Sequence, residues 1–257
     1  MKQTLPILLL LALVIGGCGS TKQSSNLNGA NLIEARFNDG KKAFEKEEWL
    51  EAIAIFDEIR LQAPSSEYAA EAAFLEGMAR YKSGTFISAA VDFRSVRRNF
   101  PSSEFAPKAQ FMIAESYYAL SPRAELDQTY TQYSINEYQT FLRDYSNGPR
   151  LLLDSADHRI TELRNKQATK ILLSAELYIK LLDTKSGLKY FARVVDNYYD
   201  TPSAVESQLR IAEVQYDRKR TKEVREALTT FDEKFLITAT QSQRERSLRI
   251  RQQLSLQ

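Results

Sequence analysis

The feature that most constrains the fold is a pattern of small, aromatic and proline residues that returns after 37 positions. Its slots hold Gly77, Ala89, Phe93, Val96 and Pro101, and one period earlier Gly40, Ala52, Phe56, Ile59 and Pro64. Three weaker copies contain Ala114, Ser134, Tyr138 and Phe141; Ala175, Gly187, Phe191 and Val194; and Ala212, Val224, Leu228 and Phe231. A repeat of this length with a bend in its middle predicts pairs of helices stacked in a row.

Each predicted pair is apolar on more than one face, so it needs neighbours of the same kind to bury that surface. The pattern resembles the tetratricopeptide repeat and predicts an all-α solenoid of about five helix pairs in a right-handed superhelix. We expect the pairs near residues 32–64, 67–101, 104–149, 151–201 and 202–238, with a capping helix over 240–255. An ordinary helical bundle with chance similarity is the alternative.

Proline, serine and threonine residues mark the predicted boundaries between the helix pairs. Pro64 and Pro101 are each followed by Ser-Ser-Glu, so we expect proline to end one helix and a serine to cap the next. Thr201 is expected to cap a helix that begins at Pro202. Two insertions lengthen the later copies.

The first insertion, Leu120 to Gln132, is expected to stretch the bend of the third pair. The second, Leu151 to Lys170, is charged and helical in pattern, so we interpret it as an extension of the first helix of the fourth pair. Such an extension would hold the two halves of the solenoid at an angle, as a structural hinge.

The N-terminal residues 1–17 have the pattern of a bacterial export signal. Lys2 precedes the apolar run Leu5 to Ile15, and Gly-Gly leads directly to Cys18, the single cysteine of the chain. This arrangement resembles a lipoprotein signal, which implies cleavage before Cys18 and acylation of Cys18, palmitate included. A buried or redox-active thiol is the alternative. Residues 18–31 are then a lipidated cysteine and a flexible tether, rich in serine, asparagine and glycine.

Residue types that carry chemistry are sparse. His158 is the one histidine and has no cysteine or second histidine near it in sequence, and no glycine-rich phosphate loop occurs. The net charge of +2 does not suggest a nucleic-acid partner. We therefore expect no enzymatic activity, no cofactor and no metal; a lipid-anchored hydrolase is the weakest of the functional hypotheses.

The first helices of the first three pairs suggest a binding surface. Aromatic residues at seven-residue spacing share one helix face. The candidate peptide-binding groove consists of Phe37, Lys41, Phe44, Phe74, Met78, Tyr81, Phe111, Glu115 and Tyr118. The alternative is that these aromatic rings only pack between repeats.

The last predicted helix is basic, with Arg244, Arg246, Arg249 and Arg251. A solenoid needs a polar outer face at its end, so a capping helix is the simplest interpretation. A basic surface for a partner or a membrane is the alternative.

Two segments carry a family resemblance. FRSVRRNFPSSEFAPKAQFMIAESYYAL (residues 93–120) and RVVDNYYDTPSA (residues 193–204), together with the lipidated cysteine, the tether and five degenerate repeats, resemble the BamD family. That family supplies a lipoprotein to the machinery that folds β-barrel proteins into the bacterial outer membrane.

The resemblance implies a lipid-anchored scaffold on the periplasmic face of the outer membrane. Its partners would be a periplasmic domain of the barrel insertase, which the C-terminal repeats would bind, and other assembly lipoproteins. The N-terminal repeats would recognise the C-terminal signals of unfolded outer-membrane proteins, which end in an aromatic residue. Another periplasmic repeat lipoprotein, one that coordinates cell-wall synthesis or envelope constriction, is the alternative.

Overall fold

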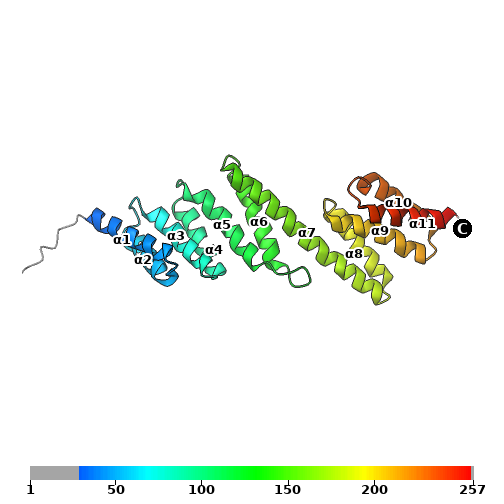
Figure 1. Cartoon of the computed structure of the whole chain (residues 1–257), viewed down its shortest axis with the longest axis horizontal. Coiled ribbons are helices and arrows are strands. Elements are labelled where there is room, and N and C mark those ends of the chain that lie inside the picture. Colours follow the sequence, from blue (N-terminus) through cyan, green and yellow to red (C-terminus); the bar gives the residue numbers. More distant parts are fainter. Residues whose placement is uncertain (1–28, 256–257) are drawn as a thin grey trace, which may run out of the picture.

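The computed structural model describes residues 29–255, and these residues form eleven α-helices and no strand. The helices are α1 (Gly29–Glu45), α2 (Trp49–Gln62), α3 (Ala69–Lys82), α4 (Phe86–Asn99), α5 (Phe105–Leu120), α6 (Thr129–Asp144), α7 (Arg150–Lys180), α8 (Thr184–Asn197), α9 (Pro202–Asp217), α10 (Thr221–Phe235) and α11 (Gln241–Ser255). Consecutive helices pack side by side along one long axis, from α1 at one end to α11 at the other (Figure 1). The predicted all-α tetratricopeptide-repeat solenoid is confirmed.

The glycine and phenylalanine positions of the repeat pack directly against each other. A Cβ atom on Gly77 would lie 2.7 Å from Cε1 of Phe93, and one on Gly40 would lie 2.7 Å from Cε1 of Phe56. Both phenylalanine rings are fully buried. The ring of each second helix therefore rests directly on the backbone of its first helix, which only a small residue permits.

The core is a series of clusters and has no single centre. The five anchor side chains, Phe56, Phe93, Tyr138, Phe191 and Leu228, each lie in a different apolar cluster. Each pair thus buries its own anchor and shares its outer faces with the neighbouring pairs. This arrangement is what makes the molecule a rod.

The prolines end helices as predicted, but the expected serine caps are wrong. Pro64 and Pro101 lie just beyond α2 and α4. The chain then makes an extra turn, so α3 and α5 begin after Tyr68 and Glu104, and neither residue gives a side-chain cap. The Ser103 hydroxyl instead donates to the Phe100 carbonyl at 2.9 Å.

Thr201 does precede α9, which begins at Pro202 as predicted. Its hydroxyl does not accept from the helix, however. It donates a hydrogen bond of 2.7 Å to the carbonyl oxygen of Tyr198. A true side-chain cap occurs at α8, where the Asp183 carboxylate accepts from the Ser186 N–H at 3.0 Å.

Helix α7 is one continuous helix of 31 residues, which confirms that the second insertion extends it. Its N-terminal half packs on α6, and its C-terminal half packs on α8 and α9 (Figure 1). The loop between α5 and α6 is fastened to its middle, because Lys166 Nζ lies 2.9 Å from Ser121 Oγ and Lys170 Nζ lies 2.7 Å from the Glu125 carbonyl oxygen. Among the described helices, α7 is the element that joins the two halves of the rod.

The N-terminal features fall at the edge of the structure. Helix α1 begins at Gly29, so the last residues of the expected tether, 29–31, are helical. Cys18 and the signal segment lie outside the described residues. Within residues 29–255, no helix combines the length and the apolar character needed to cross a bilayer.

Candidate functional site

The candidate groove residues of the first pair pack locally. The Phe37 side chain is buried, and its ring centroid lies 6.0 Å from that of Phe56 and 5.0 Å from that of Tyr68. Phe44 meets Trp49 edge to face at 5.2 Å. Lys41 is exposed and lies over the Phe37 ring, with Nζ 5.6 Å from the centroid.

In the second pair, Phe74 contacts the anchor ring of Phe93 at 5.5 Å and the Phe105 ring of the next pair at 5.3 Å. Met78 is partly buried in the same cluster. Tyr81 packs edge to face on Phe86 at 5.2 Å. These three side chains therefore join neighbouring helices.

In the third pair the candidates meet residues of α7. The Arg159 guanidinium lies 3.8 Å above the Tyr118 ring, and its Nε lies 3.2 Å from Glu115 Oε1. The Tyr118 hydroxyl donates to Glu162 at 2.6 Å. Burial, with this hydrogen bond, raises the pKa of Tyr118 to about 12. The same Glu115 carboxylate also accepts from the buried Tyr138 hydroxyl.

A cavity of about 590 Å³ lies beside this contact, between α5 and α7. We call it the α5–α7 cavity, and its lining residues are Phe111, Glu115, Leu151, Asp154, Ser155, His158 and Arg159. Apolar, anionic and cationic groups thus face one space. Two of the sequence candidates, Phe111 and Glu115, line this cavity from one face of α5.

The sequence pattern indicated a hinge for the insertion and no partner for His158, so the contribution of α7 to this site was not predicted. The available signal was a repeated Ala-Glu dipeptide in the first helices, at Glu115, Glu176 and Glu213. Each of these glutamates pairs with an arginine of the next first helix. The partners are Arg159 at 3.2 Å, Arg210 at 2.6 Å and Arg246 at 2.8 Å.

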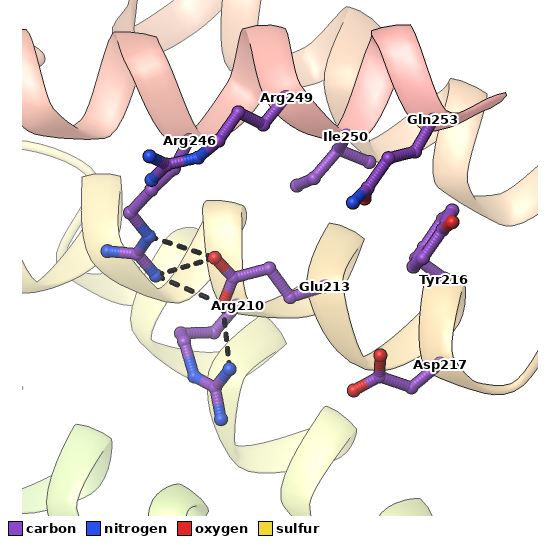
Figure 2. Close-up of a pocket in the computed structure, with 8 residues that line it drawn as sticks. All are labelled: Arg210, Glu213, Tyr216, Asp217, Arg246, Arg249, Ile250 and Gln253. Carbon is purple, nitrogen blue, oxygen red and sulfur yellow. Dashed lines mark hydrogen bonds and ion pairs between the residues drawn. The ribbon is translucent and has the colours of Figure 1, made fainter. Parts of the chain in front are cut away.

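We call this series the ion-pair ladder, and Figure 2 shows its C-terminal end. Glu213 lies between Arg210 of its own helix and Arg246 of α11, beside a cavity of about 470 Å³ between α9 and α11 (Figure 2). Burial alone would raise the pKa of Glu213, but hydrogen bonds from Arg246 and Arg210 lower it below the ordinary value. The ladder therefore fastens successive pairs to one another.

The C-terminal arginines mostly serve this fastening. Arg246 also binds Glu206, at 2.9 Å, and Arg251 binds Asp232 of α10, at 2.6 Å. Arg244 donates to the Ile237 carbonyl at 3.1 Å. These contacts agree with a capping helix, and they leave Arg249 as the exposed arginine of α11 that lines the cavity.

No group of three or more metal-ligating side chains occurs within residues 29–255. His158 is exposed on α7, and its neighbours in the α5–α7 cavity are carboxylates, a serine and an arginine that is already paired. The arrangement can hold a ligand by packing and charge.

Two solved structures are among those to which this chain shows similarity. The solved TPR2AB domain of yeast Sti1, from a pHSP90 complex, covers 88% of this chain and 100% of its own, with 14% identity and a TM-score of 0.44. The TPR domain of P58(IPK) covers 89% of this chain and 67% of its own, with 16% identity and the same TM-score of 0.44.

Comparisons of sequence identify both a relative and a family. Outer membrane protein assembly factor BamD of Rickettsia prowazekii (strain Madrid E) is 26% identical over 213 residues, which is 83% of each chain. The family model described as YfiO, outer membrane lipoprotein, matches residues 31–231, which spans all five helix pairs up to α10. The chain therefore belongs to the YfiO family of outer membrane lipoproteins.

Proposed function

We propose that this protein is a non-enzymatic scaffold of the machinery that assembles β-barrel proteins in the outer membrane. The observation that carries the proposal is its similarity to an outer membrane protein assembly factor over 83% of both chains. A rod of stacked helix pairs supports it, because such rods offer extended surfaces for other proteins. The α5–α7 cavity, with its mixed lining, fits binding better than catalysis.

The proposed place of work is the periplasmic face of the outer membrane, with acylated Cys18 as the anchor. The proposed partners are the periplasmic domain of the barrel insertase, bound by the C-terminal repeats, and other assembly lipoproteins. The ion-pair ladder supports this division, because it makes α9 and α11 a firmly joined end of the rod.

We further propose that the α5–α7 cavity receives the C-terminal signal of an unfolded outer-membrane protein. Phe111 supplies an aromatic contact, and the exposed side chains of Leu151 and His158 stand at its rim. Of the nine groove candidates, Phe111 and Glu115 take part directly. Tyr81 and Tyr118 do not line the cavity: Tyr81 packs on Phe86, and Tyr118 contacts Arg159 and Glu162.

A photocrosslinking amino acid at position 158 tests this site in cells. His158 lines the cavity, whereas its exposed neighbour Asp157 does not, so position 157 is the matched control. We expect crosslinks from position 158 to outer-membrane β-barrel proteins and few from position 157. Equal yields at both positions, or adducts without barrel proteins, would contradict a peptide site in this cavity.

A further inference from the structure

The turn between α7 and α8 holds a leucine in a strained backbone. The turns between first and second helices carry a residue of positive φ at Glu47 (61°), Gly84 (81°), Leu182 (63°) and Lys219 (58°). Glycine accepts this conformation readily, and a bulky apolar residue does not. The Leu182 side chain is 88% exposed, so burial does not offset the strain. Because Glu47 and Lys219 have the same conformation, it belongs to the repeat turn, and what sets Leu182 apart is its exposed apolar side chain.

More leucines lie along the same end of α7. Leu173, Leu177 and Leu181 are four residues apart, so they share one helix face, and all three are exposed. They follow Lys170, where the α5–α6 loop makes its contact with α7, and this end of α7 projects beyond α6 (Figure 1). We call Leu173, Leu177, Leu181 and Leu182 the apolar tip.

Basic residues flank Leu181 and Leu182 in the sequence and recur on the adjacent turn. They lie on the α7–α8 turn and on the neighbouring α9–α10 turn, and they are Lys180, Lys185, Arg218, Lys219 and Arg220. The two turns are in contact, since Arg218 Nη1 lies 3.0 Å from Thr184 Oγ1 and both turns line one cavity of about 370 Å³. We call these five residues the basic turns.

The charge of the basic turns is only weakly used among the described residues: hydrogen bonding from Ser186 lowers the pKa of Asp183, and the Lys185 charge adds to that lowering. None of the five cations forms an ion pair in the part of the chain that the structure describes. Two carboxylates are nearby: Asp183 caps α8 through Ser186, and Asp217 lies on the side of the α9–α11 cavity. The arginines of α11 differ, because Arg246 and Arg251 are paired.

We propose that the apolar tip and the basic turns bind anionic phospholipids at the surface of the membrane that carries this lipoprotein. Exposed leucines beside cations are the composition of a surface that lies in a bilayer interface, with apolar side chains in the acyl boundary and cations at the phosphates.

The family also makes a bilayer the nearest available partner. An anchored chain is held close to its membrane, so a weak second contact is effective there. The contact would bring the fourth and fifth pairs down to the membrane. This inference rests on membership of a lipoprotein family and not on the proposed insertase or peptide partners, so it survives if those fail.

Quenching by nitroxide-labelled lipid tests the proposal on the full lipidated protein. A fluorescent amino acid replaces Thr221, which is exposed beside the basic turns, or Ser102, which is exposed on the α4–α5 turn as the matched control. The protein is reconstituted in vesicles of phosphatidylethanolamine with about 30% phosphatidylglycerol, or of phosphatidylcholine alone. We expect about twofold more quenching at position 221 in the anionic vesicles and no difference at position 102.

Two further conditions identify the cause. The excess quenching should fall to the phosphatidylcholine value in about 1 M NaCl, where the Debye length is about 3 Å. It should also fall in the double variant Leu181→Ser, Leu182→Ser and persist in Leu50→Ser, whose side chain is 84% exposed on α2. Since all three leucines are exposed, these variants are expected to fold normally.

Equal quenching in both kinds of vesicle would overturn the proposal, as would quenching that ignores the tip variant. A third outcome would assign the surface to a protein partner instead. In that case an acidic protein would co-purify with the parent but not with the Leu181→Ser, Leu182→Ser variant, and the parent would show no lipid-dependent quenching.

Discussion

At the scale of single residues, the small slot of the first helix decides how closely two helices approach. Gly77 faces the Phe93 ring, with Cε1, Cδ1 and Cζ all within 3.1 Å of a Cβ built there. We expect Gly77→Ala to lower the free energy of unfolding by about 1–2 kcal/mol, because the ring must shift within a full core. Urea denaturation measures the change.

A double-mutant cycle tests the cause. Phe93→Leu removes the ring edge that the new methyl group meets, so Gly77→Ala should cost less in that background than in the parent. Equal costs in the two backgrounds would mean that helix propensity, and not contact with Phe93, governs the slot.

Asp92 provides a prediction for pH. It lies beside the buried Glu76 and forms an ion pair of 2.6 Å with Arg80. Burial raises the pKa of Asp92 to about 6; the Glu76 charge adds to the rise and Arg80 opposes it. Because the folded state then binds the proton more tightly than the unfolded state, the stabilising contribution is present below the unfolded pKa and is lost as the pH rises through about 6.

The stability of the parent relative to Asp92→Asn should therefore fall by about 1 kcal/mol between about pH 4 and pH 7. Denaturation of both proteins over that range measures it. A difference that stays constant, or that grows with pH, would place the pKa of Asp92 at or below its ordinary value.

Single residues also show which side-chain roles a sequence pattern can predict and which it cannot. The slots that hold Phe56 and Phe93 were predictable, because packing against a small residue leaves a repeated pattern. The roles of Phe37 and Phe74 were open between groove and core, and their rings prove to lie against Phe56 and Phe93. One face of a helix serves both roles, so spacing alone does not separate them.

At the scale of helices, α7 carries the connection between the two halves. Ala168 is fully buried midway along it. We expect Ala168→Pro to destabilise the protein by about 3 kcal/mol or more, since proline removes a hydrogen bond and clashes with the preceding turn. The thermal unfolding curve should then show two transitions, because the halves share few other contacts.

Ala168→Gly is the matched control, with an expected cost of about 1 kcal/mol and a single transition. A single transition for Ala168→Pro as well would show that contacts outside α7 join the halves.

The ladder makes a second prediction at this scale. Arg246 binds both Glu213 and Glu206, so Arg246→Met should cost about 2 kcal/mol and speed amide exchange in α11. Arg249→Met, an exposed change on the same helix, should be close to neutral. Equal rates of amide exchange in α11 of both variants would show that the ion-pair ladder does not hold α11 in place.

The lowered pKa of Glu213 determines how the stability of the folded state changes with pH. Its contribution is present above the ordinary value of 4.5 and is lost as the pH falls through the lower folded-state pKa. Arg246→Met should weaken this dependence on acid, which denaturation between about pH 3 and pH 6 measures.

Helix positions were largely predictable from sequence, as was the start of α9 at Pro202, but the side-chain caps were not. The prolines and the 37-residue period locate the pairs, including the long α7. The Ser-Ser-Glu segments satisfy their own turn instead of capping the next helix, as Ser103 shows. Short polar side chains bond equally well forward or backward along the chain, so sequence does not fix their direction.

At the scale of the whole molecule, stacked pairs make a rod with separable surfaces. The α5–α7 cavity, the C-terminal end of the ladder, and the apolar tip with its basic turns lie at different places along it. The repeated Ala-Glu dipeptide marked Glu115, but its partner could not be predicted, because Glu115 and Arg159 are 44 residues apart and meet only when the insertion folds back onto α5. The family resemblance, by contrast, was visible in residues 93–120 and 193–204.

The central claim is that this rod works by binding other proteins in outer-membrane assembly. Mass spectrometry of proteins that co-purify with the tagged, full-length lipoprotein from detergent-solubilised envelopes tests it most directly, with an unrelated tagged lipoprotein as the control. We expect strong enrichment of the β-barrel insertase over that control. Enrichment of cell-wall synthases without the insertase would contradict it.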